Sequence, residues 1–190
     1  DYMQRGGQSD SRGDPDERTW LRDETGGSIY LRLSTLPLEQ PGTRADDAFL
    51  QGTVDGAYWM RKPGPNCDLV IAYQGAVAAE AIAAARELAQ SRRDVGVLAV
   101  TSADRLNAGW TAAQRDRSRG NRKATSHVEA LLNRLPRQTT LLTVIDGHPA
   151  TLSWLGAVAG HRTIPLGVEH FGQTGTVANL QRHFGLDRHS

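Results

Sequence analysis

The chain has 190 residues, which fits one domain or one domain with an appended arm. Its 22 basic and 21 acidic residues give a formal net charge of +1, which argues against nucleic acid or a membrane surface as a partner, because both need a concentrated excess of Lys and Arg. No apolar run approaches the ~20 residues that span a bilayer.

The N-terminal part of the sequence has the character of an arm followed by an isolated strand. The chain starts at Asp1, which fits either a processed start or a piece of a longer protein, and the first residues are too polar for a signal peptide. Residues 1–27 are rich in Gly, Ser, Asp and Arg, so we expect them to be disordered. Residues 28–34 (SIYLRLS) predict a strand, and residues 36–47 predict a Pro-rich linker. A lone strand is unstable in water, so we expect its partners to be missing from this chain.

Regular structure is predicted from residue 57 onward. Residues 57–62 (AYWMRK) predict a short strand that ends at a PGPN turn, and residues 67–73 (CDLVIAY) predict a buried strand. Because a tight turn joins them, we expect an antiparallel hairpin. Cys67 is the single cysteine and cannot form an internal disulfide. We expect it to be a small buried hydrophobic side chain, in a protein of a reducing compartment, the cytoplasm.

A βαβ unit follows the predicted hairpin. Gly75 opens an Ala-rich stretch that reaches residue 90, and its apolar side chains recur at helical spacing. Residues 95–101 (VGVLAVT) predict the next buried strand. Strand, helix and strand with short links favour a right-handed crossover, so we expect these two strands to be parallel.

The second half of the chain continues this alternation. The basic segment 115–123 (RDRSRGNRK) is interpreted as a solvated loop. A helix is predicted over residues 124–135, with Thr125 or Ser126 as its N-cap. The elements expected after it are a strand at 139–145, a helix at 150–159 closed by Gly160, a strand at 163–170 and a helix at 176–186. Pro165 favours an edge or strand-start position for the last of these strands.

Together these elements predict an α/β fold, a three-layer αβα arrangement with a mostly parallel open sheet and an antiparallel edge strand. In such a fold ligands lie beyond the carboxyl ends of the strands. The polar residues expected at this rim are Gln74, Ser102, His148, Glu169 and His170. Their His and carboxylate groups can act as acid and base, but strand ends are also polar simply because loops are wet.

No motif in the sequence predicts a metal, cofactor or catalytic site in this chain. The His spacings do not match a short helical metal-binding pair. A phosphate-binding glycine loop and a nucleophile elbow are both missing from the sequence. Residues 172–175 (GQTG) lead into the last predicted helix, and we interpret them as a tight turn.

The order of these elements and the C-terminal stretch GVEHFGQTGTVANLQRHFGLD resemble the third domain of thiamine-diphosphate enzymes of the transketolase family. The resemblance covers roughly residues 28–188. The residues that carry the family's closing pattern are Gly167, Phe171, Gly172, Thr174, Leu180, Phe184 and Gly185. The segment VTSADRL at residues 100–106 looks more like the homodimeric E1 component of pyruvate dehydrogenase than like transketolase.

The resemblance implies a division of the chain and of the chemistry. In this family the first domain binds the diphosphate and Mg²⁺, the second binds the aminopyrimidine, and the third packs at the dimer interface without touching the cofactor. Residues 1–40 would then be a disordered arm, the last strand of a truncated pyrimidine-binding domain and a linker, and residues 41–190 the third domain. Thiamine diphosphate and Mg²⁺ would be bound by the full-length parent alone, and this fragment would be inactive by itself.

Three functions remain open on the sequence. The first is the C-terminal domain of an E1 component, with a transketolase as the alternative parent; its expected partners are a second copy, the parent's remaining domains and the E2 acyltransferase. The second is a stand-alone regulatory module that binds a small anion at the rim. The third is a self-contained hydrolase or transferase, for which the sequence offers no activated nucleophile.

Overall fold

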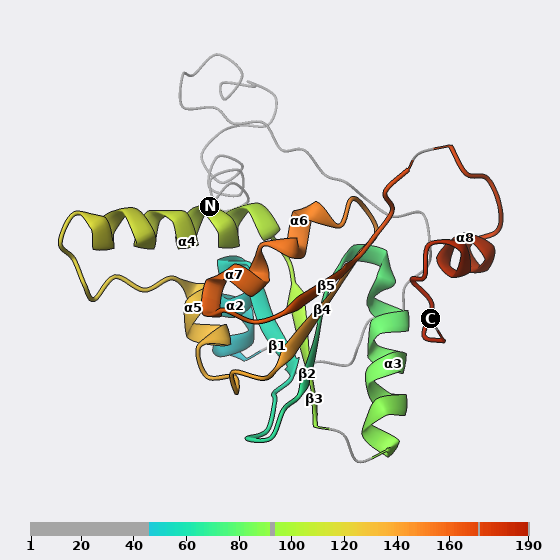
Figure 1. The fold of residues 1–190 in the computed structure, drawn as a ribbon, viewed down its shortest axis with the longest axis horizontal. Helices are drawn as coiled ribbons and strands as arrows, with labels where there is room; N and C mark the ends of the chain where they lie inside the picture. Colours follow the sequence, from blue (N-terminus) through green and yellow to red (C-terminus); the bar gives the residue numbers. More distant parts are fainter. Residues whose placement is uncertain (1–45, 92–93, 171, 190) are drawn as a thin grey trace, which may run out of the picture. The chain divides into compact units, whose positions relative to one another are not determined.

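The computed structural model describes residues 46–91, 94–170 and 172–189, which form a five-stranded sheet of order β1-β3-β2-β4-β5 with helices on both faces (Figure 1). The strands are β1 (Ala57–Arg61), β2 (Leu69–Gln74), β3 (Val95–Val100), β4 (Thr140–Ile145) and β5 (Thr163–Leu166). The helices are α2 (Asp47–Asp55), η2 (Gly75–Val77), α3 (Ala78–Gln90), α4 (Ala103–Ser118), α5 (His127–Leu132), α6 (Ala150–Ser153), α7 (Leu155–Ala159) and α8 (Val177–His183).

The expectations for the N-terminal region lie outside the described residues. They are the disordered arm, the strand at residues 28–34, most of the linker and the domain division at residue 40. These stay predictions. In the part of the chain that is described, no helix is both long and apolar enough to cross a membrane.

The sheet confirms the predicted fold class. β2 pairs in parallel with both β3 and β4, and β4 pairs in parallel with β5, so the predicted βαβ unit is present. β1 is antiparallel and lies at one edge of the sheet. β5 lies at the other edge and contains Pro165, as expected of a residue that cannot donate a ladder hydrogen bond.

The predicted hairpin between β1 and β2 is wrong. β1 pairs with β3, with Ala57 opposite Val100 and Tyr58 opposite Ala99. The connection from β1 to β2 passes the start of β3, where Gly64 N donates to Asp94 Oδ1 at 3.0 Å. The PGPN turn therefore leads the chain across β3 rather than back along β1. β2 keeps the central position, where its apolar side chains are covered on both faces.

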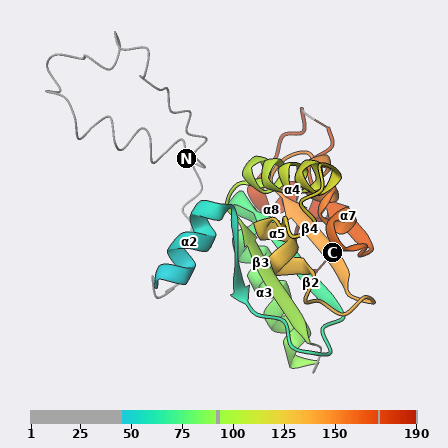
Figure 2. The ribbon, with the colours of Figure 1, turned by 90° about the vertical axis from the view of Figure 1, so that its left-hand side faces the viewer.

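Two helices were not predicted. α2 begins where Asp46 Oδ1 accepts from Phe49 N at 2.8 Å, and it ends at Gly56, whose φ of 107° is left-handed. Figure 2 shows α2 alongside β1. α4 extends to Ser118, so the expected loop at 115–123 is wrong for its first four residues and correct for residues 119–123. α4 was missed because it buries only Ala103, Leu106 and Ala113, a stripe too narrow to be recognised among its charges.

The remaining predicted elements are confirmed with shorter limits. The helix predicted at 124–135 is α5, and Ser126 rather than Thr125 is its N-cap. The helix predicted at 150–159 is interrupted at Trp154 and ends at Gly160, which has a φ of 76°. The strand predicted at 163–170 ends at Leu166. Cys67 is fully buried, and burial raises the pKa of its thiol.

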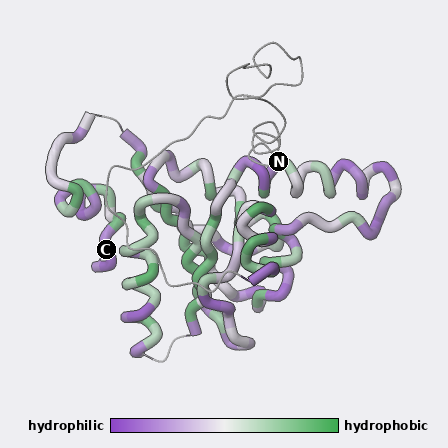
Figure 3. The backbone as a smooth tube through the Cα atoms, turned by 180° about the vertical axis from the view of Figure 1, so that it is seen from behind, coloured by the Kyte–Doolittle hydropathy of each residue, from purple (hydrophilic) through white to green (hydrophobic). Residues whose placement is uncertain are grey.

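Alternate residues along the strands divide the core into two parts, one on each face of the sheet. One face carries α4, α5, α6 and α7, and the other carries α3 together with the C-terminal segment. Along the tube in Figure 3, hydrophobic segments gather in the strands and in the buried turns of α3, whereas the far end of α4 and the loop after it are hydrophilic.

Candidate functional site

The carboxyl ends of the four parallel strands lie side by side at one end of the sheet, as the sequence predicted. Gln74 is the last residue of β2, Ser102 follows β3, and His148 follows β4. Glu169 and His170 were expected at the end of the strand, but β5 ends at Leu166, so both residues lie in the loop that follows it. In the described part of the chain, no hydrogen bond or ion pair joins any two of these five residues, so the fold places them on one rim without building a cluster.

Two of the rim residues lie at or just before the start of a helix. Ser102 is the N-cap of α4, where its Oγ accepts weakly from Arg105 N at 3.4 Å. The Ser102 hydroxyl also donates to Asp104 Oδ1 at 2.5 Å, and this bond lowers the pKa of the Asp104 carboxyl. His148 Nδ1 accepts from Ala150 N at 3.2 Å in the turn that opens α6. Local hydrogen bonds at helix starts therefore account for both side chains.

Gln74 is the rim residue whose environment is least explained by capping. It caps η2 without a side-chain hydrogen bond, and its Oε1 is buried with no partner among the described residues. Gly75 follows with a φ of 82°, and the space beside its Cα is open. β2 and β4 are adjacent here, at the point where the strand order reverses, which is the usual ligand position in doubly wound sheets. Glu169 and His170 are exposed and stay candidates on sequence grounds alone.

A pocket of about 430 Å³ lies on the α3 face of the sheet. Its apolar floor is formed by Ile71, Leu142, Val144 and Leu166, and its wall by α3. The C-terminal residues 185–189 close one side. Sequence analysis missed this pocket because its walls are about a hundred residues apart in the chain, and the helical stripe of α3 gives no sign of what packs beside it.

An ion pair fastens the C-terminal segment beside this pocket. The Arg188 guanidinium donates to Glu80 Oε2 at 3.1 Å and to Glu80 Oε1 at 3.0 Å, and Arg188 N also donates to Oε2 at 3.1 Å. The hydrogen bond from the Arg188 side chain lowers the pKa of the Glu80 carboxyl, against a smaller opposing effect of burial. Leu186, two residues earlier, is buried against the sheet. Both the apolar contact of Leu186 and the ion pair of Arg188 thus hold the segment.

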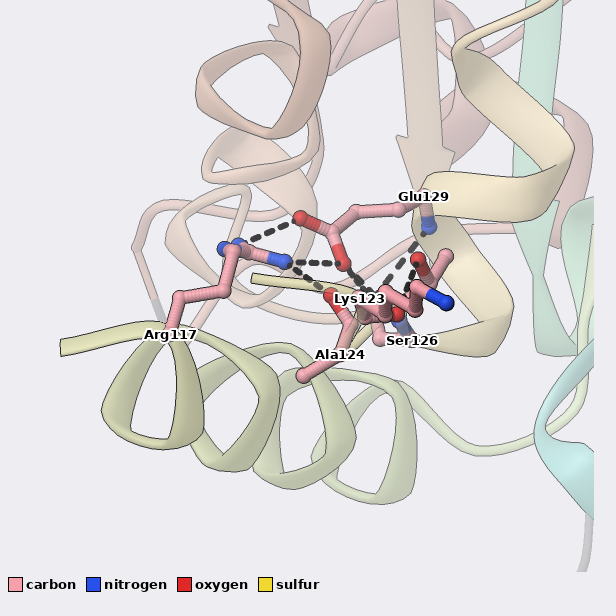
Figure 4. A network of polar contacts seen from close by, with 6 residues as sticks. Arg117, Lys123, Ala124, Ser126 and Glu129 are labelled. Atoms are coloured by element: carbon pink, nitrogen blue, oxygen red, sulfur yellow. Dashed lines mark hydrogen bonds and ion pairs between the residues drawn. The ribbon is translucent and has the colours of Figure 1, made fainter. Parts of the chain in front are cut away.

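A second polar network joins α4 to α5 (Figure 4). Ser126 and Glu129 form a reciprocal capping box at the start of α5. The Arg117 guanidinium contacts both oxygens of Glu129, at 2.7 and 3.2 Å. Burial alone would raise the pKa of the Glu129 carboxyl, but hydrogen bonds from Arg117 and Ser126 outweigh it and hold the pKa below its ordinary value. The S-x-x-E spacing of the capping box is the sequence signal that could have revealed this network.

Among the described residues, no group of three or more His, Cys, Asp or Glu side chains is arranged to hold a metal ion. The polar networks that are present tie elements of the domain to each other. They stabilise helix starts, the loop after α4 and the C-terminal segment.

Comparisons with known proteins gave one family match and a likeness in fold to solved structures. A family model described as the transketolase-like TK C-terminal domain matches residues 56–187. The structure is similar to transketolase from Leishmania mexicana, with 21% identity over 74% of this chain and a TM-score of 0.51. It is also similar to transketolase from Campylobacter jejuni, with 16% identity over 71% of this chain and a TM-score of 0.50. The chain spans 17% of the length of each of these transketolases. A comparison with curated proteins gave no match.

Proposed function

The chain belongs to the family of transketolase-like C-terminal domains, and we propose that it serves as the third, non-catalytic domain of a thiamine-diphosphate-dependent transketolase. The observation that carries this proposal is the family match over residues 56–187, which includes every strand of the sheet and the C-terminal helix. The parent enzyme would transfer a ketol unit between sugar phosphates, with thiamine diphosphate and Mg²⁺ held by its other domains.

The role proposed for this domain is to support those other domains and the homodimer. Local hydrogen bonds at helix starts account for Ser102 and His148 at the rim, and this is expected where the rim carries no chemistry. The hydrogen-bond networks join elements of the same domain. They hold its surface in a defined shape that a neighbouring domain can contact. Fold likeness alone does not assign a substrate, so the ketol-transfer activity of the parent rests on the family.

The E1 component of a 2-oxo acid dehydrogenase is the second candidate parent. One observation favours it, the segment VTSADRL at residues 100–106, which resembles the E1 sequence at the end of this strand. Both solved structures described above are transketolases, so we rank the transketolase first. Partnership with an E2 acyltransferase applies to the E1 parent alone.

One experiment separates a third domain from a stand-alone module. An antibody raised against residues 176–189 is used to blot extracts of the source cells, with the purified 20.7 kDa chain as a size standard. The proposal predicts a band several times heavier than the standard. A single band at the size of the standard would instead support the stand-alone regulatory module.

A second experiment tests the division of chemistry and the choice of parent. Calorimetry of the purified chain with thiamine diphosphate and Mg²⁺ is expected to show no binding heat, and micromolar binding would contradict the proposal. The heavier protein captured by the antibody is then assayed with a ketose phosphate donor and an aldose phosphate acceptor, and separately with 2-oxo acids and an artificial electron acceptor. Ketol transfer supports the transketolase, and oxidation of a 2-oxo acid supports the E1 component.

A further inference from the structure

The far end of α4 and the loop that follows it form the most basic part of the sequence. We define residues 115–123 as the α4 tip. This segment contains five basic residues and one acidic residue, in a chain whose net charge is +1. Arg115, Arg119, Arg122 and Lys123 are all exposed. Figure 1 shows the α4 tip extending away from the sheet, and Figure 3 shows that its backbone runs through hydrophilic residues.

The α4 tip is held by its own backbone and does not hang as a loose loop. Arg119 N donates to the carbonyl oxygens of Arg115 and Asp116, both at 3.1 Å, so the last turn of α4 is closed. Asn121 N donates to Asp116 O at 3.0 Å, and Gly120 supplies the left-handed φ of 103° that turns the chain. These bonds fix the positions from which the cationic side chains extend.

Arg117 fastens the α4 tip to the body of the domain. Its guanidinium forms the two hydrogen bonds with Glu129 described above and a third with Ala124 O at 2.7 Å (Figure 4). Glu129 Oε2 also accepts from Ser126 N and Ser126 Oγ, both at 2.8 Å. One of the five cations is therefore used internally, and its bonds join the end of the loop and α5 to α4.

The four remaining cations have no such internal use. Among the described residues, no hydrogen bond or ion pair engages the side chains of Arg115, Arg119, Arg122 or Lys123. A helix C-terminus favours nearby cations, which accounts for Arg115, but Arg122 and Lys123 lie beyond the end of α4. Gathering like charges at one point is unfavourable for the isolated domain.

We propose that the α4 tip is a docking surface for an acidic segment of another protein. Arginine guanidinium groups form paired hydrogen bonds with carboxylates, and three of the four free cations are Arg. A surface that is already ordered loses little conformational entropy on binding. Single-stranded nucleic acid is disfavoured because residues 115–123 contain no aromatic side chain for stacking. Trp110, farther back on α4, is already stacked on Trp154, with 5.4 Å between their ring centroids, so its ring is engaged within the domain.

The first test compares two double variants that remove the same charge. The probe is a fluorescein-labelled peptide of eight glutamates, and its binding is followed by fluorescence anisotropy in 50 mM and 200 mM NaCl. R119Q/R122Q removes two cations of the α4 tip, whereas R134Q/R137Q removes two exposed cations after α5. We expect R119Q/R122Q to weaken binding at least tenfold, R134Q/R137Q to change it less than twofold, and salt to weaken binding by the wild type. An absence of binding by the wild type, or equal losses in the two variants, would overturn the proposal.

The second test asks whether the Arg117–Glu129 contact positions the α4 tip. Glu129→Gln makes the chain more positive, so net charge alone predicts tighter binding. Our proposal predicts binding at least threefold weaker, because the loop loses its ionic attachment to α5 while keeping all four cations. Circular dichroism verifies that the variant is folded; if it is not, the exposed double variants alone decide. Stronger binding of a single-stranded oligothymidine than of the peptide would also overturn the proposal, in favour of nucleic acid.

Discussion

The two faces of the sheet are covered in different ways. On the first face, α4, α5, α6 and α7 cover strand residues that are almost completely buried, such as Val70, Leu98 and Leu141. On the second face, α3 and the C-terminal segment bury Ile71 and several neighbours, but other side chains of that face are only partly buried. The partly buried side chains on the sheet include Tyr58, Met60, Leu69, Leu142 and Leu166.

This difference follows from the helices that the sequence supplies. α3 approaches the sheet closely through Ala81 and Ala85, but one helix of this kind covers only a narrow strip. The first face receives several short helices, whose Leu132, Leu152 and Leu155 fill the space between them and the sheet. The free energy of unfolding should therefore depend more strongly on packing at the first face. The second face should rearrange more easily.

The largest effect is expected from a matched pair of substitutions in β4. Leu141 is 1% exposed and faces the first side of the sheet, whereas its neighbour Leu142 is partly buried in the floor of the pocket. We expect Leu141→Ala to lower the free energy of unfolding by about 3 kcal/mol, since it leaves a cavity in a close-packed core. Leu142→Ala should cost about 1 kcal/mol, because less apolar area is lost from the interior. Urea denaturation measures both, and equal losses would mean that the two faces are equally well packed.

A smaller loss of stability is expected from substituting a glycine in α7, one of the helices that cover the first face. A Cβ added at Gly156 in α7 would overlap Thr163 Oγ1 and lie 2.5 Å from His161 O. We expect Gly156→Ala to cost about 2 kcal/mol, because the neighbours are a β-branched side chain and a backbone carbonyl that cannot easily move.

Gly109 provides the control for that substitution. It lies inside α4, and a Cβ there would meet nothing within 4 Å. Gly109→Ala should raise the free energy of unfolding by about 0.5–1 kcal/mol, since Ala loses less backbone entropy than Gly in a helix. Thermal denaturation followed by circular dichroism compares the two; a stable Gly156→Ala would show that α7 can move away from the sheet.

The sequence alone predicted an element correctly where its local pattern agreed with its environment in the fold. The apolar runs of β2, β3 and β4 and the Ala-rich stripe of α3 predicted the parallel core, because these patterns are fixed by burial on the sheet. The pairing of β1 was not predictable in this way, since its partner β3 is about forty residues away and the intervening turn resembled a hairpin. α4 was missed because its exposed, charged turns have the composition of a loop.

The functional surfaces divide in the same manner. Strand order predicted where the rim lies, but not that Ser102 and His148 would serve the starts of helices. The pocket and the Glu80–Arg188 pair depend on contacts between segments that are far apart in the chain, and no local pattern specifies them. The Arg117–Glu129 contact is only partly predictable. The capping box of Glu129 is a local sequence pattern, whereas Arg117 is twelve residues away and no pattern assigns it as the partner.

The smallest expected effect concerns the second face and its C-terminal segment. Because Arg188 lowers the pKa of Glu80, the pair stabilises the folded state above the carboxyl's unfolded pKa, and this contribution is lost as the pH falls through the lowered folded value. Wild type and Glu80→Gln should therefore differ in urea stability at pH 7 by less than either core substitution, and the difference should shrink toward pH 3. Glu87→Gln is the matched control, because Glu87 lines the same pocket and attracts Arg188 only at longer range, without a hydrogen bond to it in the described structure. If the two variants have the same pH profile, the C-terminal segment is held by Leu186 and not by the ion pair, and the second face depends on apolar contact as much as the first.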